Sequence, residues 1–316
     1  MLSLWLASEN SPLRILDSPN ARSLHEHPTP RTGGVAIIVS AIAGWGVLVW
    51  YSGWPAEMRW VAFAALLTAA VSFTDDVREL SAGIRLAVHA LAAAILIAGE
   101  MVLPWGWFGT IITFLAIIWA LNLYNFMDGM DGFAGGMAVF GFGFLGLAGS
   151  QSGNGAFAWY SWMVAASALG FLLLNFPPAR IFMGDAGSAT LGLLAAGFSL
   201  WGIHAGLFSL WLPLLVFSPF VVDATVTLLR RALRGDRVWQ AHRTHYYQRL
   251  VRAGWGHRKT VLAEYALMLA AGGSAILMQA GFIPVAAGLI GWAIIFILLA
   301  RVTDRFCADK NTRGEQ

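Results

Sequence analysis

Long apolar runs are the feature that most constrains how this sequence can fold. Ten of them can cross a bilayer or nearly do so, because about 20 apolar residues in a helix span the hydrocarbon core. The runs cover residues 34–51, 59–74, 84–103, 108–123, 133–149, 156–175, 188–204, 207–229, 260–280 and 282–302. Hydrophobic residues make up 58% of the chain and charged residues 12%, which excludes a water-soluble domain of this length. The sequence therefore predicts an all-α, polytopic integral membrane protein with about ten transmembrane helices.

The positions of the charged residues test this number of spans and predict an orientation. When the gaps between runs are assigned alternately to two sides, 19 of the 20 Lys and Arg residues fall on one side and Arg59 on the other. Positive residues concentrate in cytoplasmic loops, so the first side is predicted to be cytoplasmic, with both termini. Its segments are 1–33, 75–83, 124–132, 176–187, 230–259 and 303–316. The net charge of +3 thus reflects topology and does not indicate a nucleic-acid partner.

We predict a single transmembrane domain over residues 1–316. It has a cytoplasmic lead-in at 1–33, its longest cytoplasmic loop at 230–259, and a polar C-terminal tail at 303–316. The first twenty residues contain charges and no long apolar core, so no cleavable signal peptide is expected. Cys307 is the only cysteine, which excludes an intrachain disulfide.

The stretch from Asn122 to Gly136 carries the densest set of polar groups between two apolar runs. Its polar residues recur every third position, and they are Asn122, Asn125, Asp128 and Asp131. One unbroken helix cannot aim all four side chains at one point. Gly129 and Gly132 are expected to let the backbone leave the helix and gather oxygens and free amides around a small volume. This pattern is typical of a site for a cation and a phosphate, and an ordinary polar loop is the alternative.

Two further predicted cytoplasmic segments hold carboxylates. Asp75 and Asp76 end a span, and such paired acids can hold Mg²⁺ against a pyrophosphate, although a helix-end charge cluster explains them too. In the segment 176–188, glycines flank Asp185, and Ser188 is expected to be the N-cap of the next helix. With the aromatic ring of Phe182 and free amides, this segment suits a metal-bridged nucleotide diphosphate.

Two segments are rich in basic residues. In the loop 230–259, His242, Arg243 and His245 share one helical turn and can clamp a diphosphate, while positive-inside topology is the alternative explanation. Zinc binding by the two histidines is disfavoured because no third strong ligand is near. The segment 25–34 holds Pro28 and Pro30, which forbid helix, and it is either a basic membrane anchor or part of the site. All five polar clusters are predicted to converge on the cytoplasmic face.

Five motifs in this order resemble the polyprenyl-phosphate N-acetylhexosamine-1-phosphate transferase superfamily. They are Pro-Thr-Pro-Arg-Thr-Gly-Gly (28–34), Asp-Asp (75–76), Asn-Phe-Met-Asp-Gly-Met-Asp-Gly (125–132), Phe-Met-Gly-Asp-Ala-Gly-Ser (182–188) and Ala-His-Arg-Thr-His-Tyr-Tyr-Gln-Arg-Leu (241–250). The last motif is closest to the branch that initiates O-antigen and related surface glycans. The chain departs from the family pattern in two ways: residues 1–20 are too short and polar to supply the span that usually precedes the first motif, and the histidine motif is reduced to two histidines.

The resemblance implies transfer of a sugar 1-phosphate from a UDP-N-acetylhexosamine to polyprenyl (undecaprenyl) phosphate. The products are UMP and a polyprenyl diphosphosugar, which starts a lipid-linked glycan such as O-antigen or another cell-envelope polysaccharide. The resemblance further implies Mg²⁺ as cofactor, with Mn²⁺ as an alternative ion, and an active site on the cytoplasmic face of the inner membrane. It is compatible with a homodimer.

The resemblance also assigns roles to residues. Asp185 is implied as the principal Mg²⁺ ligand, Asn125 as a second one, and Phe182 as the ring that packs on uracil. The acidic residues implied in catalysis are Asp75 and Asp76, facing the lipid phosphate, and Asp128 and Asp131, at the metal-diphosphate and nucleoside region. The residues implied at the donor diphosphate are His242, Arg243 and His245. Because the acceptor phosphate is mostly dianionic at neutral pH, a one-step displacement needs little proton abstraction and is preferred to a phosphorylated carboxylate.

Two other functions compete with this interpretation. A cation or proton transporter would also cluster aspartates in a polytopic protein, but it needs polar groups through the whole membrane thickness, and the opposite loops are short and nearly featureless. A CDP-alcohol phosphatidyltransferase would need further spaced acids after its first Asp-Gly. After Asp131 and Gly132 this chain has no acid until Asp185.

Overall fold

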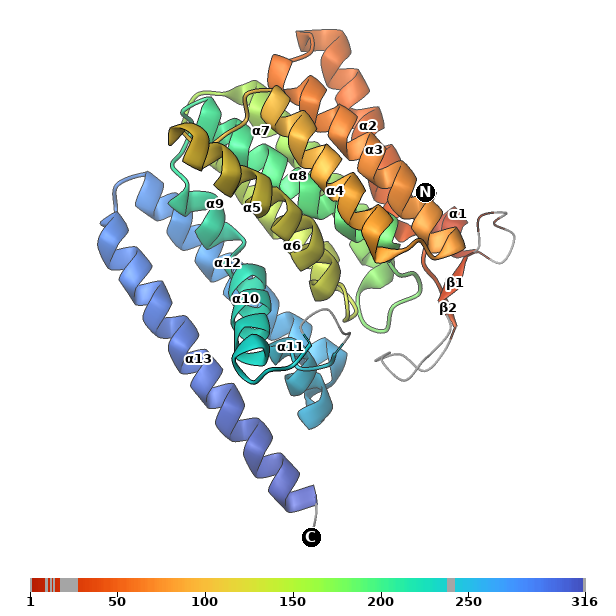
Figure 1. The fold of residues 1–316 in the computed structure, drawn as a ribbon, viewed down its shortest axis with the longest axis vertical. Helices are drawn as coiled ribbons and strands as arrows, with labels where there is room; N and C mark the ends of the chain where they lie inside the picture. The colour runs from red at the N-terminus through yellow and green to blue at the C-terminus, as the bar shows by residue number, and fades with distance from the viewer. Residues whose placement is uncertain are drawn as a thin grey trace.

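The protein is a bundle of long helices, as the sequence predicts (Figure 1). The computed structural model describes residues 2–8, 11, 13, 15–17, 28–237 and 242–314. Residues 25–27 of the lead-in and Ala241 of the histidine motif lie outside this part of the chain. Two short strands, β1 (Leu16–Asp17) and β2 (Thr29–Pro30), pair antiparallel with Leu16 opposite Pro30. The lead-in therefore meets the bundle as an extended segment, in agreement with its two prolines.

The helices within the described residues differ widely in length. In chain order they are α1 (Leu2–Ala7), α2 (Gly33–Ser52), α3 (Ala56–Arg78), α4 (Ala82–Ala98), α5 (Gly106–Met127), α6 (Phe133–Gln151), α7 (Gly155–Asn175), α8 (Gly184–His204), α9 (Trp211–Val216), α10 (Ser218–Leu233), α11 (Tyr246–Leu250), the π-helix η1 (Val251–Trp255), α12 (Gly256–Gln279) and α13 (Val285–Gly314).

Eight helical segments in the described part of the chain are long and apolar enough to cross a membrane. They are α2, α3, α5, α6, α7, α8, the continuous segment Tyr246–Gln279 and α13. Two of the ten predicted spans do not meet this standard. The run 84–103 forms α4, which has only 17 residues, and the run 207–229 is broken at Phe217 into α9 and α10. Pro219 stands in the first turn of α10, where its missing N–H costs no helical hydrogen bond. The multi-pass fold is confirmed, and the number of ten spans stays a prediction.

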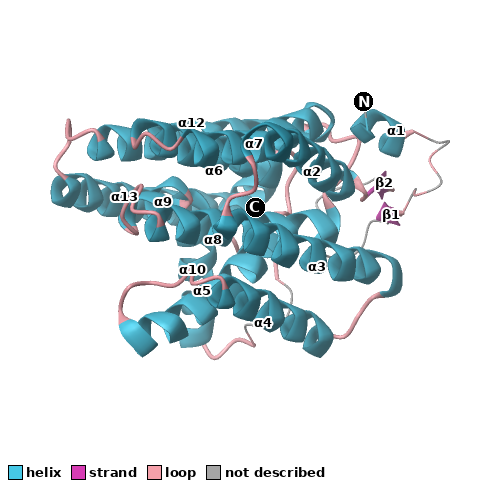
Figure 2. Cartoon of the chain, turned by 90° about the horizontal axis from the view of Figure 1, so that it is seen from above, coloured by secondary structure: helices cyan, strands magenta, loops and turns pink. Residues whose placement is uncertain are grey.

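Helix α8 lies at the centre of the bundle and packs against α2, α3, α5 and α6 (Figure 2). Its most apolar window is 83% buried, whereas the corresponding window of α13 is 0% buried. Small residues allow this central position. Gly187 of α8 meets Gly34 of α2 backbone to backbone, with no room for a Cβ on either residue. The Gly34 N–H donates to the Met183 carbonyl at 2.8 Å, which fixes the start of α8 against the start of α2.

The C-terminal helix α13 runs along one edge of the molecule, apart from the main bundle (Figure 1). The predicted polar tail 303–316 is largely helical, because α13 continues to Gly314. Asp304 ties this extension to the preceding segment: its carboxylate oxygens accept from Arg230 at 2.9 Å and from Arg249 at 2.6 Å. The predicted loop 230–259 is itself built mostly of the end of α10, α11, η1 and the start of α12.

The polar clusters meet at one end of the bundle, as predicted. The Phe182 N–H donates to the Pro30 carbonyl at 2.7 Å, and the Tyr247 hydroxyl donates to the Phe126 carbonyl at 3.2 Å. At the opposite end, Gln279 Nε2 donates to Ser152 Oγ at 2.9 Å. These contacts join loops that the sequence assigns to the same side. The alternation of the helices therefore agrees with the prediction, whereas the cytoplasmic position of the polar end remains to be tested.

Cysteine labelling can test that orientation. Single cysteines at Ser81 and Ser152, both exposed serines, would be introduced in a Cys307→Ser background. We expect an impermeant thiol reagent to label only the position 152 cysteine in intact cells, because positive residues hold the polar end inside. Permeabilised cells should label both. Labelling of the position 81 cysteine from outside would contradict the orientation.

Candidate active site

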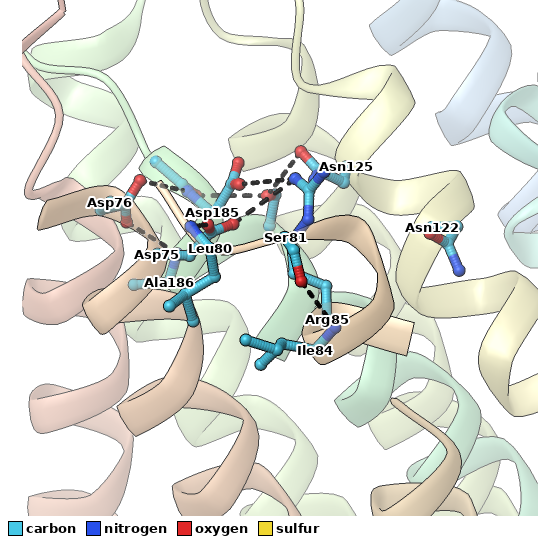
Figure 3. Close-up of polar contacts among 12 residues, drawn as sticks. Asp75, Asp76, Leu80, Ser81, Ile84, Arg85, Asn122, Asn125, Asp185 and Ala186 are labelled. Carbon is cyan, nitrogen blue, oxygen red and sulfur yellow. Dashed lines mark hydrogen bonds and ion pairs between the residues drawn. The ribbon is translucent and has the colours of Figure 1, made fainter. Parts of the chain in front are cut away.

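An acidic cluster occupies the polar end of the bundle (Figure 3). Asp75 and Asp76 lie in the last turn of α3, and Asp185 lies in the first turn of α8. Asp128 directly follows α5, close enough for Asp185 and Asp76 to act on its charge. Residues separated by more than 100 positions in the chain thus share one volume. The structure brings together these four predicted site residues.

Asp76 holds the start of α8 in place. One oxygen of its buried carboxylate accepts from the Asp185 N–H at 3.0 Å, and the other accepts from the Ala186 N–H at 2.9 Å. The first amides of a helix lack partners within the helix, and a carboxylate there also interacts well with the helix dipole. Arg31 lies 3.9 Å away from the same carboxylate. Both oxygens of Asp76 are therefore engaged in fixing α8 beside α3.

The predicted N-cap role of Ser188 is wrong. Helix α8 begins at Gly184, four residues earlier, where the backbone has a positive φ of 73° that glycine adopts readily. Ser188 lies inside the helix, and its hydroxyl is 3.2 Å from the Gly184 carbonyl and 3.3 Å from Asn125 Oδ1. The carboxylate of Asp76, from another helix, accepts the amide hydrogens that a local cap would otherwise accept. A local sequence pattern cannot show such a partner.

Arg85 connects two carboxylates of the cluster. Its Nη1 lies 3.4 Å from Asp75 Oδ2 and 3.7 Å from Asp185 Oδ2 (Figure 3). The other oxygen of Asp75 accepts from the Leu80 N–H at 2.6 Å, which closes the end of α3. Our sequence reasoning counted Arg85 only as a positive charge near a membrane face. The available signal was a lone arginine at the start of an apolar run.

The polar stretch after residue 121 separates into distinct parts. Asn125 faces the acidic cluster, where its Oδ1 accepts from Ser188 Oγ. Asn122 lies apart (Figure 3): its Nδ2 donates to the Ile118 carbonyl at 2.8 Å and lies 3.4 Å from Nδ1 of the buried His89. Gly132 has a positive φ of 75°, which confirms its predicted role in the turn. As expected, one helix does not aim all the polar side chains at one point.

Asp131 ties three segments together. Its Oδ2 accepts from the Ala179 N–H at 3.0 Å, and its Oδ1 lies 3.1 Å from Nδ1 of His257 in α12. The neighbouring Gly132 N–H donates to Asn175 Oδ1 at 2.9 Å. Both carboxylate oxygens of Asp131 therefore have protein partners. His257, which the sequence showed only as one of several basic residues in its loop, orders the edge of the site.

Asp223 fixes residues 242–247, the histidine segment, which carries His242, Arg243 and His245. His245 is buried, and its Nδ1 lies 3.2 Å from Asp223 Oδ1. A carboxylate only accepts hydrogen bonds, so Nδ1 carries a proton and Nε2 is the ring nitrogen left for a ligand. Asp223 also accepts the N–H groups of Tyr246 at 3.0 Å and Tyr247 at 3.1 Å. The sequence analysis did not single out Asp223. The signal was a carboxylate inside the apolar run 207–229, because a charged residue in such a run usually has a specific partner.

His242 is neutral at neutral pH. Burial lowers the pKa of His242 to about 4, and the nearby His245 and Arg231 act in the same direction. Its Nδ1 lies 2.9 Å from the Thr244 hydroxyl, and the rings of His242 and His245 are 4.9 Å apart. The permanent positive charge of this short motif therefore comes from Arg243. The Tyr247 hydroxyl donates a hydrogen bond to the Phe126 carbonyl near the end of α5 and so holds the motif beside the acidic cluster.

Phe182 precedes α8 and is half-buried. Its N–H donates to the Pro30 carbonyl, and its carbonyl accepts from the Gly33 N–H at 2.9 Å. The aromatic ring therefore stands on a backbone held on both sides by the lead-in.

The donor groups of the cluster suit a hard cation. Asp75 and Asp185 offer carboxylate oxygens and Asn125 offers its Oδ1, and Mg²⁺ prefers oxygen ligands. Burial raises the pKa of Asp128 well above its usual range, and the charges of Asp185 and Asp76 raise it further. No group of three or more His, Cys, Asp or Glu side chains among the described residues is arranged as a metal site. Mg²⁺ commonly takes one or two carboxylates and completes its shell with water and phosphate, so the residues present fit it.

An apolar cavity with a volume of about 180 Å³ lies between α5, α8, α9 and α10. Its walls run from Leu103 and Ile203 at the far end to Tyr124 and Phe220 at the polar end. Tyr124 lies close enough to Asp128 for the charge of that carboxylate to act on it, so this end of the cavity is near the acidic cluster. Its lining of aliphatic and aromatic side chains suits a hydrocarbon chain.

Comparisons with known proteins find one matching family model and several similar proteins. A family model described as glycosyl transferase family 4 matches residues 58–203, which include every carboxylate of the acidic cluster. The chain is 31% identical to a probable undecaprenyl-phosphate N-acetylglucosaminyl 1-phosphate transferase of Bacillus subtilis, over 91% of this chain and 84% of the relative. It is 28% identical to the undecaprenyl-phosphate alpha-N-acetylglucosaminyl 1-phosphate transferase of Yersinia pestis, over 90% and 82%. It is 32% identical to a decaprenyl-phosphate N-acetylglucosaminephosphotransferase of Mycolicibacterium smegmatis, over 78% and 71%.

Proposed function

The chain belongs to the family of polyprenyl-phosphate N-acetylhexosamine-1-phosphate transferases, and we propose that it transfers N-acetylglucosamine 1-phosphate from UDP-N-acetylglucosamine to a polyprenyl phosphate. The products are UMP and a polyprenyl diphosphosugar. The observation that carries this proposal is the acidic cluster of oxygen donors, which lies near the basic histidine segment and near one end of an apolar cavity. A nucleotide diphosphate, a cation and a lipid phosphate all have matching surfaces there.

The donor binds between the cluster and the histidine segment. Asp185 and Asn125, with Asp75 beside them, would hold a Mg²⁺ ion, with Mn²⁺ as the alternative, which when bound supplies positive charge to the diphosphate. Arg243 binds the diphosphate oxygens from the other side, and His245, as an imidazolium paired with Asp223, would donate to them from Nε2. Phe182 offers its ring to the uracil base. These residues orient the phosphorus atom that carries the sugar towards the membrane surface.

The acceptor attacks that phosphorus atom in one step. An oxygen of the lipid phosphate forms the new P–O bond, and the bond between the two donor phosphates breaks, with the electron pair leaving on UMP. The lipid phosphate carries about −1.5 to −2 charges at pH 7, so no side chain needs to remove a proton. Asp75 and Asp76 already bond to Leu80, Arg85 and the start of α8, which suits a positioning role. The apolar cavity along α5, with a volume of about 180 Å³, has room for only a short part of the prenyl chain, and the rest would lie in the lipid.

We place the reaction at the cytoplasmic face of the plasma membrane, as the first step of a lipid-linked cell-envelope glycan such as O-antigen. A homodimer is compatible with this reaction. Family membership favours this reaction over a CDP-alcohol phosphatidyltransferase or a cation or proton transporter, the two competing interpretations of the sequence.

A purified-enzyme assay tests the proposed function. The detergent-purified protein would be incubated with Mg²⁺, a labelled polyprenyl phosphate and one UDP-sugar at a time. We expect a diphosphate-linked lipid and UMP from UDP-N-acetylglucosamine, no product from the corresponding prenol, and loss of turnover with excess EDTA that added Mg²⁺ restores. If a properly folded protein forms product only from another UDP-sugar, the assigned donor is wrong, and if it forms no lipid product from any of them, the function is wrong.

A further inference from the structure

Arg85 lies where the acidic cluster meets the lipid-facing surface of the protein. It stands in the first turn of α4, and its side chain is 43% exposed. Its neighbours Ile84 and Leu86 are 47% and 54% exposed, as expected for side chains that contact lipid. On the other side, the Arg85 guanidinium group reaches Asp75 and Asp185. A phosphate that arrives on a membrane lipid would therefore meet Arg85 at the edge of the cluster.

The charges of the cluster create a need for a cation at this edge. Even with Mg²⁺ at Asp185 and Asn125, a phosphate that carries nearly two negative charges gains from a further cation beside the Asp75 and Asp185 carboxylates. Arg31 is less suited to this role, because its Nη2 donates to the backbone carbonyl of Asp76, which holds the guanidinium on the Asp76 side of the cluster. In the described part of the chain, Arg85 is the basic side chain that pairs with Asp75 and Asp185.

The contacts of Arg85 leave most of its binding capacity free. Both ion pairs use the same atom, Nη1, at 3.4 Å and 3.7 Å. Charge-assisted hydrogen bonds of full strength measure about 2.7–2.9 Å, so these contacts are loose. Within the described residues, no hydrogen bond or ion pair uses the other N–H groups of this guanidinium. The planar group can therefore present two parallel N–H donors to a phosphate without giving up a strong contact.

We propose that Arg85 binds the phosphate of the lipid acceptor and holds it next to Asp75 and Asp185 for attack on the donor. This inference rests on the proposed function, because it names the residue that receives the second substrate. It assigns to Arg85 a role that is separate from the donor clamp formed by Arg243 and His245. The alternative is that Arg85 only neutralises Asp75 and Asp185 and never contacts a substrate.

Substrate kinetics of purified Arg85→Gln distinguish the two roles. Removal of a charged, bidentate phosphate contact should raise the KM for polyprenyl phosphate by roughly tenfold to a hundredfold. The KM for UDP-N-acetylglucosamine and the Mg²⁺ concentration for half-maximal activity should change less than about twofold. Arg85→Lys keeps the charge but loses the bidentate geometry, so we expect a smaller, severalfold rise in the acceptor KM. Arg234→Gln removes an exposed arginine at the end of α10 and serves as the control without effect.

The outcomes separate cleanly. An unchanged acceptor KM in Arg85→Gln, with a shifted Mg²⁺ dependence or donor KM, would overturn the proposal in favour of simple charge neutralisation. If Arg85→Gln is not monodisperse after purification, Arg85→Lys decides: a raised acceptor KM supports the proposal and an unchanged one overturns it. Absence of lipid product from the wild-type protein would refute the proposed function itself, which the unsubstituted enzyme tests independently of Arg85.

Discussion

Asp185→Asn should lower kcat by a factor of about a hundred or more while the protein remains folded. Asparagine keeps the size of the side chain but removes the negative charge that, in the proposed function, would bind Mg²⁺ next to the donor diphosphate. A hundredfold loss corresponds to about 2.7 kcal/mol of transition-state stabilisation, which is a reasonable value for one charged contact with the metal. The measurement is kcat of the detergent-purified variant with UDP-N-acetylglucosamine, polyprenyl phosphate and saturating Mg²⁺.

The structure explains why this substitution should spare the fold. The bond that anchors the start of α8 comes from the Asp185 backbone N–H, which asparagine retains, and not from its carboxylate. The side chain makes a loose ion pair with Arg85 at 3.7 Å and a hydrogen bond with the Asp75 side chain, for which asparagine keeps one oxygen and adds N–H donors. Glu57→Gln, a charge removal in the first turn of α3 at the opposite end of that helix, is the matched control and should keep full activity. Near-normal turnover of Asp185→Asn would remove Asp185 from the metal site.

The helices could be predicted from sequence because their cause is local. A run of about 20 apolar residues has few alternatives to a membrane helix, and nearly every predicted run contains one. The meeting of the polar loops at one end followed from counting spans between them. Sequence hydropathy did not show the internal structure of the run 207–229, because its high average conceals a break at Phe217 and a carboxylate at position 223.

The roles of individual carboxylates could not be predicted, because they depend on partners that are distant in the chain. Asp75 and Asp76 are adjacent and look equivalent in sequence. In the structure, Asp76 caps α8 across a separation of 109 residues, whereas Asp75 faces Arg85 and the cluster. Helix geometry causes this difference, since neighbouring residues on a helix point about 100° apart. Ser188 shows the same effect, because Asp76 supplies the cap that was assigned to it.

The second large effect is expected at Asp223. Its buried carboxylate accepts hydrogen bonds from Thr227 Oγ1, His245 Nδ1 and the N–H groups of Tyr246 and Tyr247. Asparagine has one acceptor oxygen and an NH₂ group with two N–H donors. In Asp223→Asn this NH₂ group faces the buried donors that the second carboxylate oxygen accepted, so those donors lose their partner. A buried donor without a partner costs roughly 1–3 kcal/mol. We expect lower thermal stability and a histidine segment that no longer fixes His245.

Kinetics distinguish a loss of position from a loss of stability. If Asp223 acts by orienting His245, Asp223→Asn should raise the KM for the UDP-sugar by about tenfold and lower kcat, with little change in the KM for polyprenyl phosphate. Thr227→Val removes one donor to the same carboxylate at nearly constant volume and leaves His245 in place, so its donor KM should stay near that of the wild type.

A double variant gives the sharpest test of this pathway. Residues that act through one another are not additive, so a protein with both Asp223→Asn and His245→Ala should be no less active per folded molecule than one with His245→Ala alone. Independent contributions would instead multiply, and the double variant would lose activity by the product of the two single factors. Multiplied losses, or an unchanged donor KM in Asp223→Asn, would show that Asp223 supports the fold of α10 and α11 without positioning the donor.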